Sequence, residues 1–103
     1  RKEMLELESV RGSLEVSETP GKRSIEFRRP GELLKIIRTP RKILKEYRTP
    51  EGLYRINISD GSISRKGGRE LKDRFERVQK TVKREVEKLE ARADIRRSGT
   101  ARW

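Results

Sequence analysis

The sequence predicts an α+β fold on three observations. Apolar residues alternate with polar ones in the first half of the chain, proline-headed units recur at ten-residue spacing, and residues 69–95 contain neither glycine nor proline. Alternation is typical of strands, and an uninterrupted segment with apolar residues every three or four positions is typical of a helix. We therefore expect one small basic domain over residues 1–97, with two β-hairpins, two short proline-initiated helices and one long C-terminal amphipathic helix.

The first predicted hairpin has its strands near residues 13–17 and 23–28. Leu14 and Val16 alternate with polar neighbours, and so do Ile25 and Phe27. Pro20–Gly21 lies between the two strands, and Pro–Gly suits the centre of a type II turn. We expect this hairpin to form one cover of a small core.

Three consecutive units form an internal repeat over residues 28–57, and they read RRPGELLKII, RTPRKILKEY and RTPEGLYRIN. Proline is favoured at the first position of a helix, and after Pro30 and Pro40 apolar residues follow three, four and seven positions later. This spacing predicts two short helices separated at Pro40. The third unit alternates instead, so it predicts a strand, which the Asp60–Gly61 turn folds into the second hairpin.

Each repeat unit also places cations at equivalent positions. We expect two rows of positive charge that track a phosphate backbone, continued by the Gly67–Gly68 loop, where the N–H groups and dipole of a helix N-terminus favour an anion. The alternative is a solvated surface that keeps the domain soluble, with the loop as a plain connector. The expected phosphate contacts are Arg28, Lys35, Arg38, Lys45, Arg48, Arg55, Arg65, Lys66, Gly67, Gly68 and Arg69.

The predicted long helix covers about residues 69–95. Its apolar residues recur at steps of three and four positions, which gives one narrow stripe suited to packing along the sheet or along another helix. The stripe comprises Leu71, Phe75, Val78, Val82, Val86 and Leu89. After it, residues 98–103 predict a short mobile tail.

Composition excludes several kinds of chemistry. The 103 residues include 28 basic and 17 acidic ones, a net charge of +11, and no cysteine or histidine. Thiol, disulfide and imidazole chemistry and zinc-finger sites are therefore excluded, and we expect no metal, no cofactor and no catalytic activity. No apolar run approaches the roughly 18 residues of a membrane span, and no signal-peptide core is visible, so we expect an intracellular location or one within a particle.

The charge indicates the class of partner. Residues 21–69 carry fourteen basic and five acidic residues, a net charge of +9, and such a segment favours nucleic acid, an anionic membrane surface or an acidic protein surface. We expect a structural or assembly component of a nucleoprotein complex or virion, which forms homo- or hetero-oligomers and contacts phosphate backbones without sequence specificity. The alternative is a purely protein-binding assembly subunit that uses the helix stripe and the sheet edges against acidic neighbours.

Overall fold

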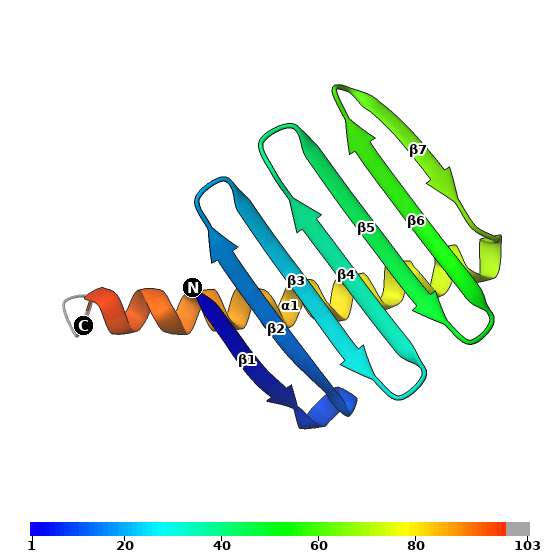
Figure 1. Ribbon diagram of the computed structural model, residues 1–103. Helices are drawn as coiled ribbons and strands as arrows, with labels where there is room; N and C mark the ends of the chain where they lie inside the picture. The colour runs from blue at the N-terminus through cyan, green and yellow to red at the C-terminus, as the bar shows by residue number, and fades with distance from the viewer. Residues whose placement is uncertain (99–103) are drawn as a thin grey trace.

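The computed structural model describes the backbone of residues 1–98 and the side chains of residues 1–92. It consists of one antiparallel sheet and one long helix, α1 (Arg69–Ser98) (Figure 1). A 3-10 turn, η1 (Glu8–Val10), joins the first two strands. The strands are β1 (Lys2–Leu7), β2 (Gly12–Thr19), β3 (Lys22–Arg29), β4 (Glu32–Arg38), β5 (Lys42–Thr49), β6 (Gly52–Ser59) and β7 (Ser62–Lys66).

The strands follow one another across the sheet in sequence order, from β1 at one edge to β7 at the other. Consecutive strands from β2 onward are joined by tight turns, as in the Arg29↔Glu32 and Thr49↔Gly52 pairs that close two of them. These turns recur every ten residues. The ten-residue repeat is therefore one strand plus one turn, and the proline of each unit is the first residue of a turn.

The predicted mixed fold with a long C-terminal helix is confirmed, but the two short helices are wrong. Residues 32–38 and 42–49 are strands β4 and β5. The helical spacing arose because β4 is apolar on both faces: Leu34 and Ile36 point toward α1, whereas Leu33 and Ile37 lie on the other face. A strand that is apolar on both sides loses its alternation and imitates a helical pattern.

The number of hairpins is also wrong. Hairpins do form where they were expected, from β2 and β3 and from β6 and β7, but every consecutive pair from β3 to β6 forms one too, and β1 adds a further strand. All seven strands belong to one sheet. The tail predicted over residues 98–103 lies outside the described residues, except for Ser98 at the end of α1.

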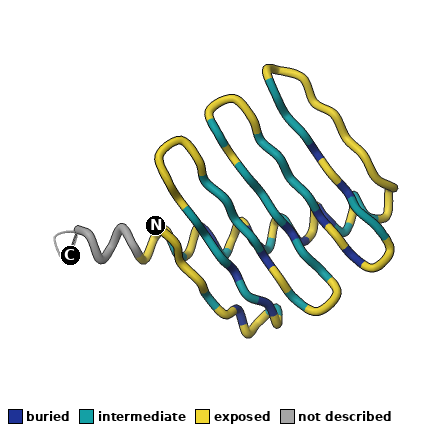
Figure 2. The backbone as a smooth tube through the Cα atoms, viewed as in Figure 1, coloured by how far each residue is buried: buried dark blue, intermediate teal, exposed yellow. Residues whose placement is uncertain are grey.

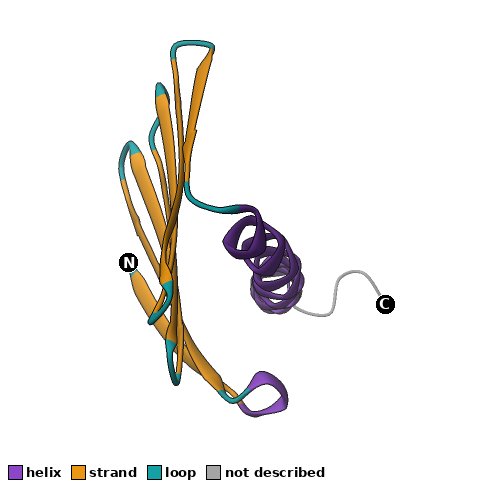
Figure 3. Cartoon of the chain, turned by 90° about the vertical axis from the view of Figure 1, so that its right-hand side faces the viewer, coloured by secondary structure: helices purple, strands orange, loops and turns teal. Residues whose placement is uncertain are grey.

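Helix α1 packs diagonally across one face of the sheet and leaves the other face bare (Figures 1 and 3). The core lies between the helix and that face, where Phe75 contacts the rings of Tyr54 and Tyr47 at centroid distances of 5.2 and 6.4 Å. Fully burying such apolar side chains stabilises the fold by roughly 1.5–3 kcal/mol each. The buried apolar residues are Leu7, Leu14, Phe27, Leu34, Tyr47, Tyr54, Ile56, Phe75, Val78, Val82 and Val86.

Residues ten positions apart lie on opposite faces of the sheet. Lys45 pairs with Ile36 on the helix-covered face, whereas Lys35 pairs with Glu26 and Glu46 on the bare face. The reason is geometric: paired residues of an antiparallel hairpin share a face, and a two-residue turn pairs odd-numbered with even-numbered positions. Equivalent environments therefore return every twenty residues.

Candidate functional site

The repeat cations do not form the expected two rows on one surface, because the ten-residue spacing sends successive units to opposite faces. The structure places them on the bare face, on the helix-covered face and beside the start of α1. The bare face carries Arg28, Lys35, Arg48, Arg55 and Lys66, and the helix-covered face carries Arg38, Lys45 and Arg65.

Cations of the bare face largely stand beside carboxylates. Arg28 Nη2 lies 2.5 Å from Glu26 Oε1, and Arg55 Nη2 lies 3.6 Å from Glu46 Oε2. Lys35 is paired in register between the same two glutamates. Arg28 and Glu26 are neighbours on one face of β3, whereas Arg55 and Lys35 lie directly across from glutamates. Such pairs stabilise a sheet modestly, so these three cations have a structural use without any ligand.

A shallow depression of about 620 Å³ lies at the end of the sheet formed by the Pro30–Gly31 and Pro50–Glu51 turns. Charges of both signs line it. Its basic residues are Arg11, Arg28, Arg29 and Arg48, and its acidic residues are Glu6 and Glu32.

At that end of the sheet, a network of paired charges surrounds Glu32; we call it the paired end. Tyr47 Oη donates a hydrogen bond of 2.8 Å to Glu32 Oε1, and Arg29 Nε donates to Glu32 Oε2. Arg74 of α1 reaches both Glu32 Oε1, at 3.4 Å, and Glu51 Oε2, at 3.6 Å. This network ties the β3–β4 and β5–β6 turns to the helix.

The titration of the paired end follows from its geometry. Burial and then the hydrogen bond to Glu32 raise the pKa of the Tyr47 hydroxyl to about 12. Burial acts to raise the pKa of Glu32, but the hydrogen bonds from Arg29, Tyr47 and Arg74 outweigh it and lower that pKa. At neutral pH, Glu32 is therefore ionised and the Tyr47 hydroxyl keeps its proton.

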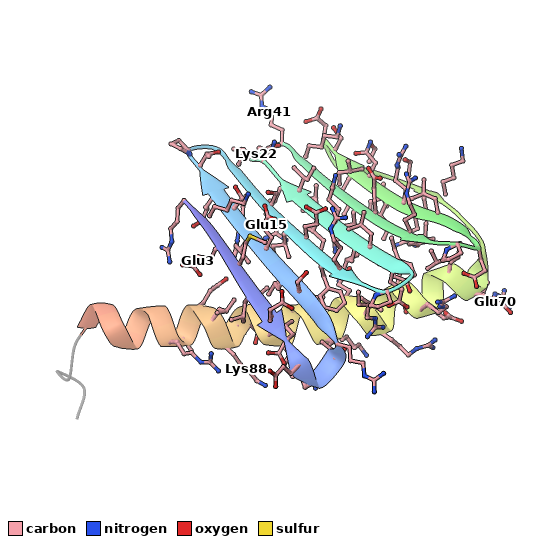
Figure 4. All side chains as sticks on the ribbon, turned by 60° about the horizontal axis from the view of Figure 1, so that its bottom comes forward. Glu3, Glu15, Lys22, Arg41, Glu70 and Lys88 are labelled. Atoms are coloured by element: carbon pink, nitrogen blue, oxygen red, sulfur yellow. The ribbon has the colours of Figure 1, made fainter. Side chains whose placement is uncertain are left out.

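The opposite end of the sheet carries unpaired positive charge, and we call it the basic end. It comprises four residues around the neighbouring tips of the β2–β3 and β4–β5 hairpins: Lys22, Arg38, Arg41 and Lys42. All four are exposed, and none forms an ion pair with any residue that the structure describes. Figure 2 shows both tips as exposed, and Figure 4 shows Lys22 and Arg41 projecting from the same end of the sheet.

The β4–β5 tip is held by its own turn. Thr39 N donates a hydrogen bond of 2.9 Å to Lys42 O, and Lys42 N donates one of 3.2 Å to Thr39 Oγ1. Pro40 and Arg41 occupy the tip between them. The Arg41 side chain is therefore carried on an ordered turn at the end of two long strands.

Beside the basic end, three cations crowd together where α1 crosses the sheet. The Lys45 ammonium donates a hydrogen bond of 3.3 Å to Gln79 Oε1. Burial, and then the charges of Arg38 and Lys83, lower the pKa of Lys45. No carboxylate among the described residues forms an ion pair with these three cations, which we call the cation cluster.

The loop before α1 has a structural explanation of its own. At Gly67, φ is 128°, and an added Cβ would lie 2.8 Å from Tyr54 Cδ1 and 2.9 Å from Leu53 O, so only glycine fits. Gly68 faces open space, and its carbonyl accepts a hydrogen bond of 3.0 Å from Lys72 N. The contact with Leu53 puts the loop next to the β5–β6 turn, away from the basic end.

The helix stripe packs on the chain's own sheet. Phe75, Val78, Val82 and Val86 are buried, and Leu71 and Leu89 are half-buried against the same core. The residues that sequence reasoning did not include in the site are Lys22, Arg41, Lys42 and Lys83. The twenty-residue return of the sheet environment is the signal that could have placed the tip residues together.

Comparisons with protein-family models, with curated proteins and with solved structures found no match for this chain. Within residues 1–98, no helix is long and apolar enough to cross a membrane. The described part of the chain also contains no group of three or more acidic, histidine or cysteine side chains that could hold a metal ion.

Proposed function

We propose that this protein is a non-catalytic structural component of a nucleoprotein assembly or virion, and that its basic end contacts phosphate backbones without sequence specificity. One observation carries the proposal: four exposed cations gather on two neighbouring hairpin tips with no carboxylate partner among the described residues. The tips are two strand spacings apart, about 10 Å, so one polyanionic strand can contact both of them.

The described part of the chain offers no exposed aromatic platform, which supports contact with the backbone rather than with bases. The rings of Phe27, Tyr47, Tyr54 and Phe75 are all buried in the core, so none of them is free to stack on a base. When cations alone contact the phosphates, the affinity comes from the release of counterions and does not depend on the base sequence.

The test is a titration of the full chain with random and defined duplexes at several salt concentrations. The logarithm of the affinity is expected to fall steeply and linearly with the logarithm of the salt concentration, equally for all duplexes. The triple substitution Lys22→Gln, Arg41→Gln and Lys42→Gln is expected to weaken binding by roughly 1 kcal/mol or less per contact and to reduce the salt dependence. A flat salt response, or a strong preference for one duplex, would contradict the proposal.

A second candidate, a protein-binding assembly subunit, is favoured by the exposed edges of the sheet. Strands β1 and β7 are the two edges, and Met4 and Ile63 on them are 69% and 57% exposed. Unpaired edge strands are templates for another strand. The helix stripe does not serve this candidate, because the chain's own sheet covers it.

The two candidates differ in what an edge substitution does. If edge pairing is the function, Ile63→Lys lowers the mass of the assembly measured by sedimentation and leaves the monomer folded. If the basic end is the functional surface, the same substitution leaves the affinity for duplexes unchanged or slightly higher.

A further inference from the structure

A hollow of about 250 Å³ lies between α1 and strands β3, β4 and β5, next to the cation cluster. Its walls combine apolar and charged side chains. The apolar wall consists of Ile25, Ile36, Val82 and Val86. An apolar wall beside a charged rim is the usual composition of a small-molecule site, in which a few polar groups fix the orientation of the ligand.

The charges around this hollow are unbalanced. Four cations and two carboxylates line it, and one carboxylate, Glu90, is already engaged by Arg23 Nη2. The cation cluster of Arg38, Lys45 and Lys83 has no carboxylate partner of its own. Like charges held together at a partly desolvated position destabilise a protein unless an anion joins them.

One arginine of the hollow carries an unsatisfied donor. Arg23 Nε is a buried nitrogen with no hydrogen-bond partner, and Glu18 Oε1 lies 3.8 Å from it. Buried polar groups are nearly always hydrogen-bonded, and an orphaned donor in a native structure is explained by a missing partner. The arginine that carries this donor lines the hollow.

From the hollow and the unmatched cation cluster, we infer that this protein binds a small amphipathic anion: one phosphate or carboxylate group attached to an apolar chain. The anionic group is held by Lys45, Lys83 and Arg38, and the apolar chain lies on Ile36 and Val82. The hollow is below the 300–1,000 Å³ typical of sites for drug-sized ligands, so it buries only the first few methylene groups of the chain.

This inference goes beyond nucleic-acid binding, although Arg38 belongs to both surfaces. The anion it requires is small and partly apolar, whereas the basic end requires a polyanion. Substitutions that avoid Arg38 therefore separate the two proposals, because the basic end includes Lys22, Arg41 and Lys42, and the hollow includes Lys45 and Lys83.

The first experiment compares three probes by isothermal titration calorimetry with the full chain: n-octyl phosphate, inorganic phosphate and n-octanol. Burial of about two methylene groups is expected to make octyl phosphate bind at least tenfold more tightly than inorganic phosphate. Octanol is expected to bind at least tenfold more weakly than octyl phosphate. Equal affinity for octyl phosphate and inorganic phosphate would overturn the inference, and so would equal affinity for octyl phosphate and octanol.

The second experiment uses the substitution Lys83→Gln, with Lys80→Gln as its matched control. Both lysines are exposed on α1, so neither change disturbs the fold, but only Lys83 lines the hollow. Lys83→Gln is expected to weaken the binding of octyl phosphate at least threefold, and Lys80→Gln is expected to leave it unchanged. Equal effects of the two changes would contradict a localised site.

Substitution of Lys45 by methionine distinguishes a lysine that binds the anion from one that only supports the fold. Lys45→Met keeps an unbranched side chain, one atom shorter, and removes a crowded charge. The substitution is expected to raise the melting temperature, to weaken the binding of octyl phosphate at least tenfold and to leave the binding of duplexes intact. A variant that melts lower and still binds octyl phosphate like the parent would overturn the inference. Conversely, if the parent protein binds octyl phosphate but does not bind duplexes, only the proposed function is rejected.

Discussion

The two ends of the sheet use charge in opposite ways. At the paired end, Glu32 is contacted by Tyr47, Arg29 and Arg74, and every one of these groups has a partner. At the basic end, Lys22 and Arg41 stand on neighbouring tips with no ion pair among the described residues. Both ends belong to the same seven strands and have turns of the same length.

The difference separates charges that hold the fold together from charges available to a partner. A carboxylate that accepts several charge-assisted hydrogen bonds fixes the turns around it. Exposed cations without partners contribute little to stability and repel one another, so the fold alone does not explain their gathering. Arg11 and Arg48 near the paired end also form no ion pair among the described residues. The gathering of four unmatched cations on two neighbouring tips, rather than total charge, therefore identifies the candidate surface.

Loss of a core aromatic ring sets the largest expected effect. Phe75 is only 2% exposed, and its ring contacts those of Tyr54 and Tyr47. Phe75→Ala is expected to cost about 3–5 kcal/mol or to unfold the protein, because it removes buried apolar contacts and leaves a cavity. Urea denaturation measures the loss. A variant as stable as the parent would mean that α1 does not pack on the sheet.

Removal of the central carboxylate tests the paired end. Glu32→Ala is expected to destabilise the protein by about 2 kcal/mol, because Tyr47 Oη and the two arginines lose their acceptor. Glu51→Ala is the matched control: its side chain is 67% exposed and contacts only Arg74 among the charged groups, so no measurable change is expected. If the two variants have equal midpoints of urea denaturation, Glu32 contributes no more to stability than the exposed Glu51 does.

The tyrosine of the paired end predicts a loss of stability in alkali. Its pKa is raised to about 12 in the fold, against about 10 in an unfolded chain, so the folded state holds more protons between pH 10 and 12. The contribution of Tyr47 is therefore complete below pH 10 and is lost as pH rises toward 12.

Replacement of this tyrosine isolates that effect. Tyr47→Phe is expected to cost about 1 kcal/mol at neutral pH, because a buried hydrogen bond is lost. The gap in denaturation midpoint between parent and variant is then expected to narrow or reverse above pH 10. A gap that stays constant from pH 8 to pH 12 would show that the hydroxyl does not titrate as its surroundings require.

The long helix and the turns could be predicted from the sequence because their signals are local. The spacing of Phe75, Val78, Val82 and Val86 fits a helix and no strand, and Pro20–Gly21 and Asp60–Gly61 are turn residues whatever surrounds them. Strands β4 and β5 were missed because apolar residues on both faces removed the alternation that defines a strand.

The composition of the basic end depends on pairing across the sheet, which no local pattern contains. Lys35 and Lys45 look equivalent in the repeat, yet the antiparallel register puts them on opposite faces. Lys22 precedes the repeat and Arg41 lies within it, and only the meander brings the two to the same end. Lys83 joins Lys45 because of the diagonal path of α1, which depends on tertiary packing.

The central claim is that unmatched cations, and not simply net charge, contact the polyanion. The most direct test compares two double variants with the same net charge: Lys22→Gln with Arg41→Gln at the basic end, and Arg28→Gln with Arg55→Gln on the bare face. We expect the first to lower the slope of log affinity for a random duplex against log salt by about two, at about 0.9 per phosphate contact. The second is expected to leave this slope nearly unchanged, because Arg28 and Arg55 are paired with glutamates. Equal reductions in the two variants, or a larger one in the second, would contradict the claim.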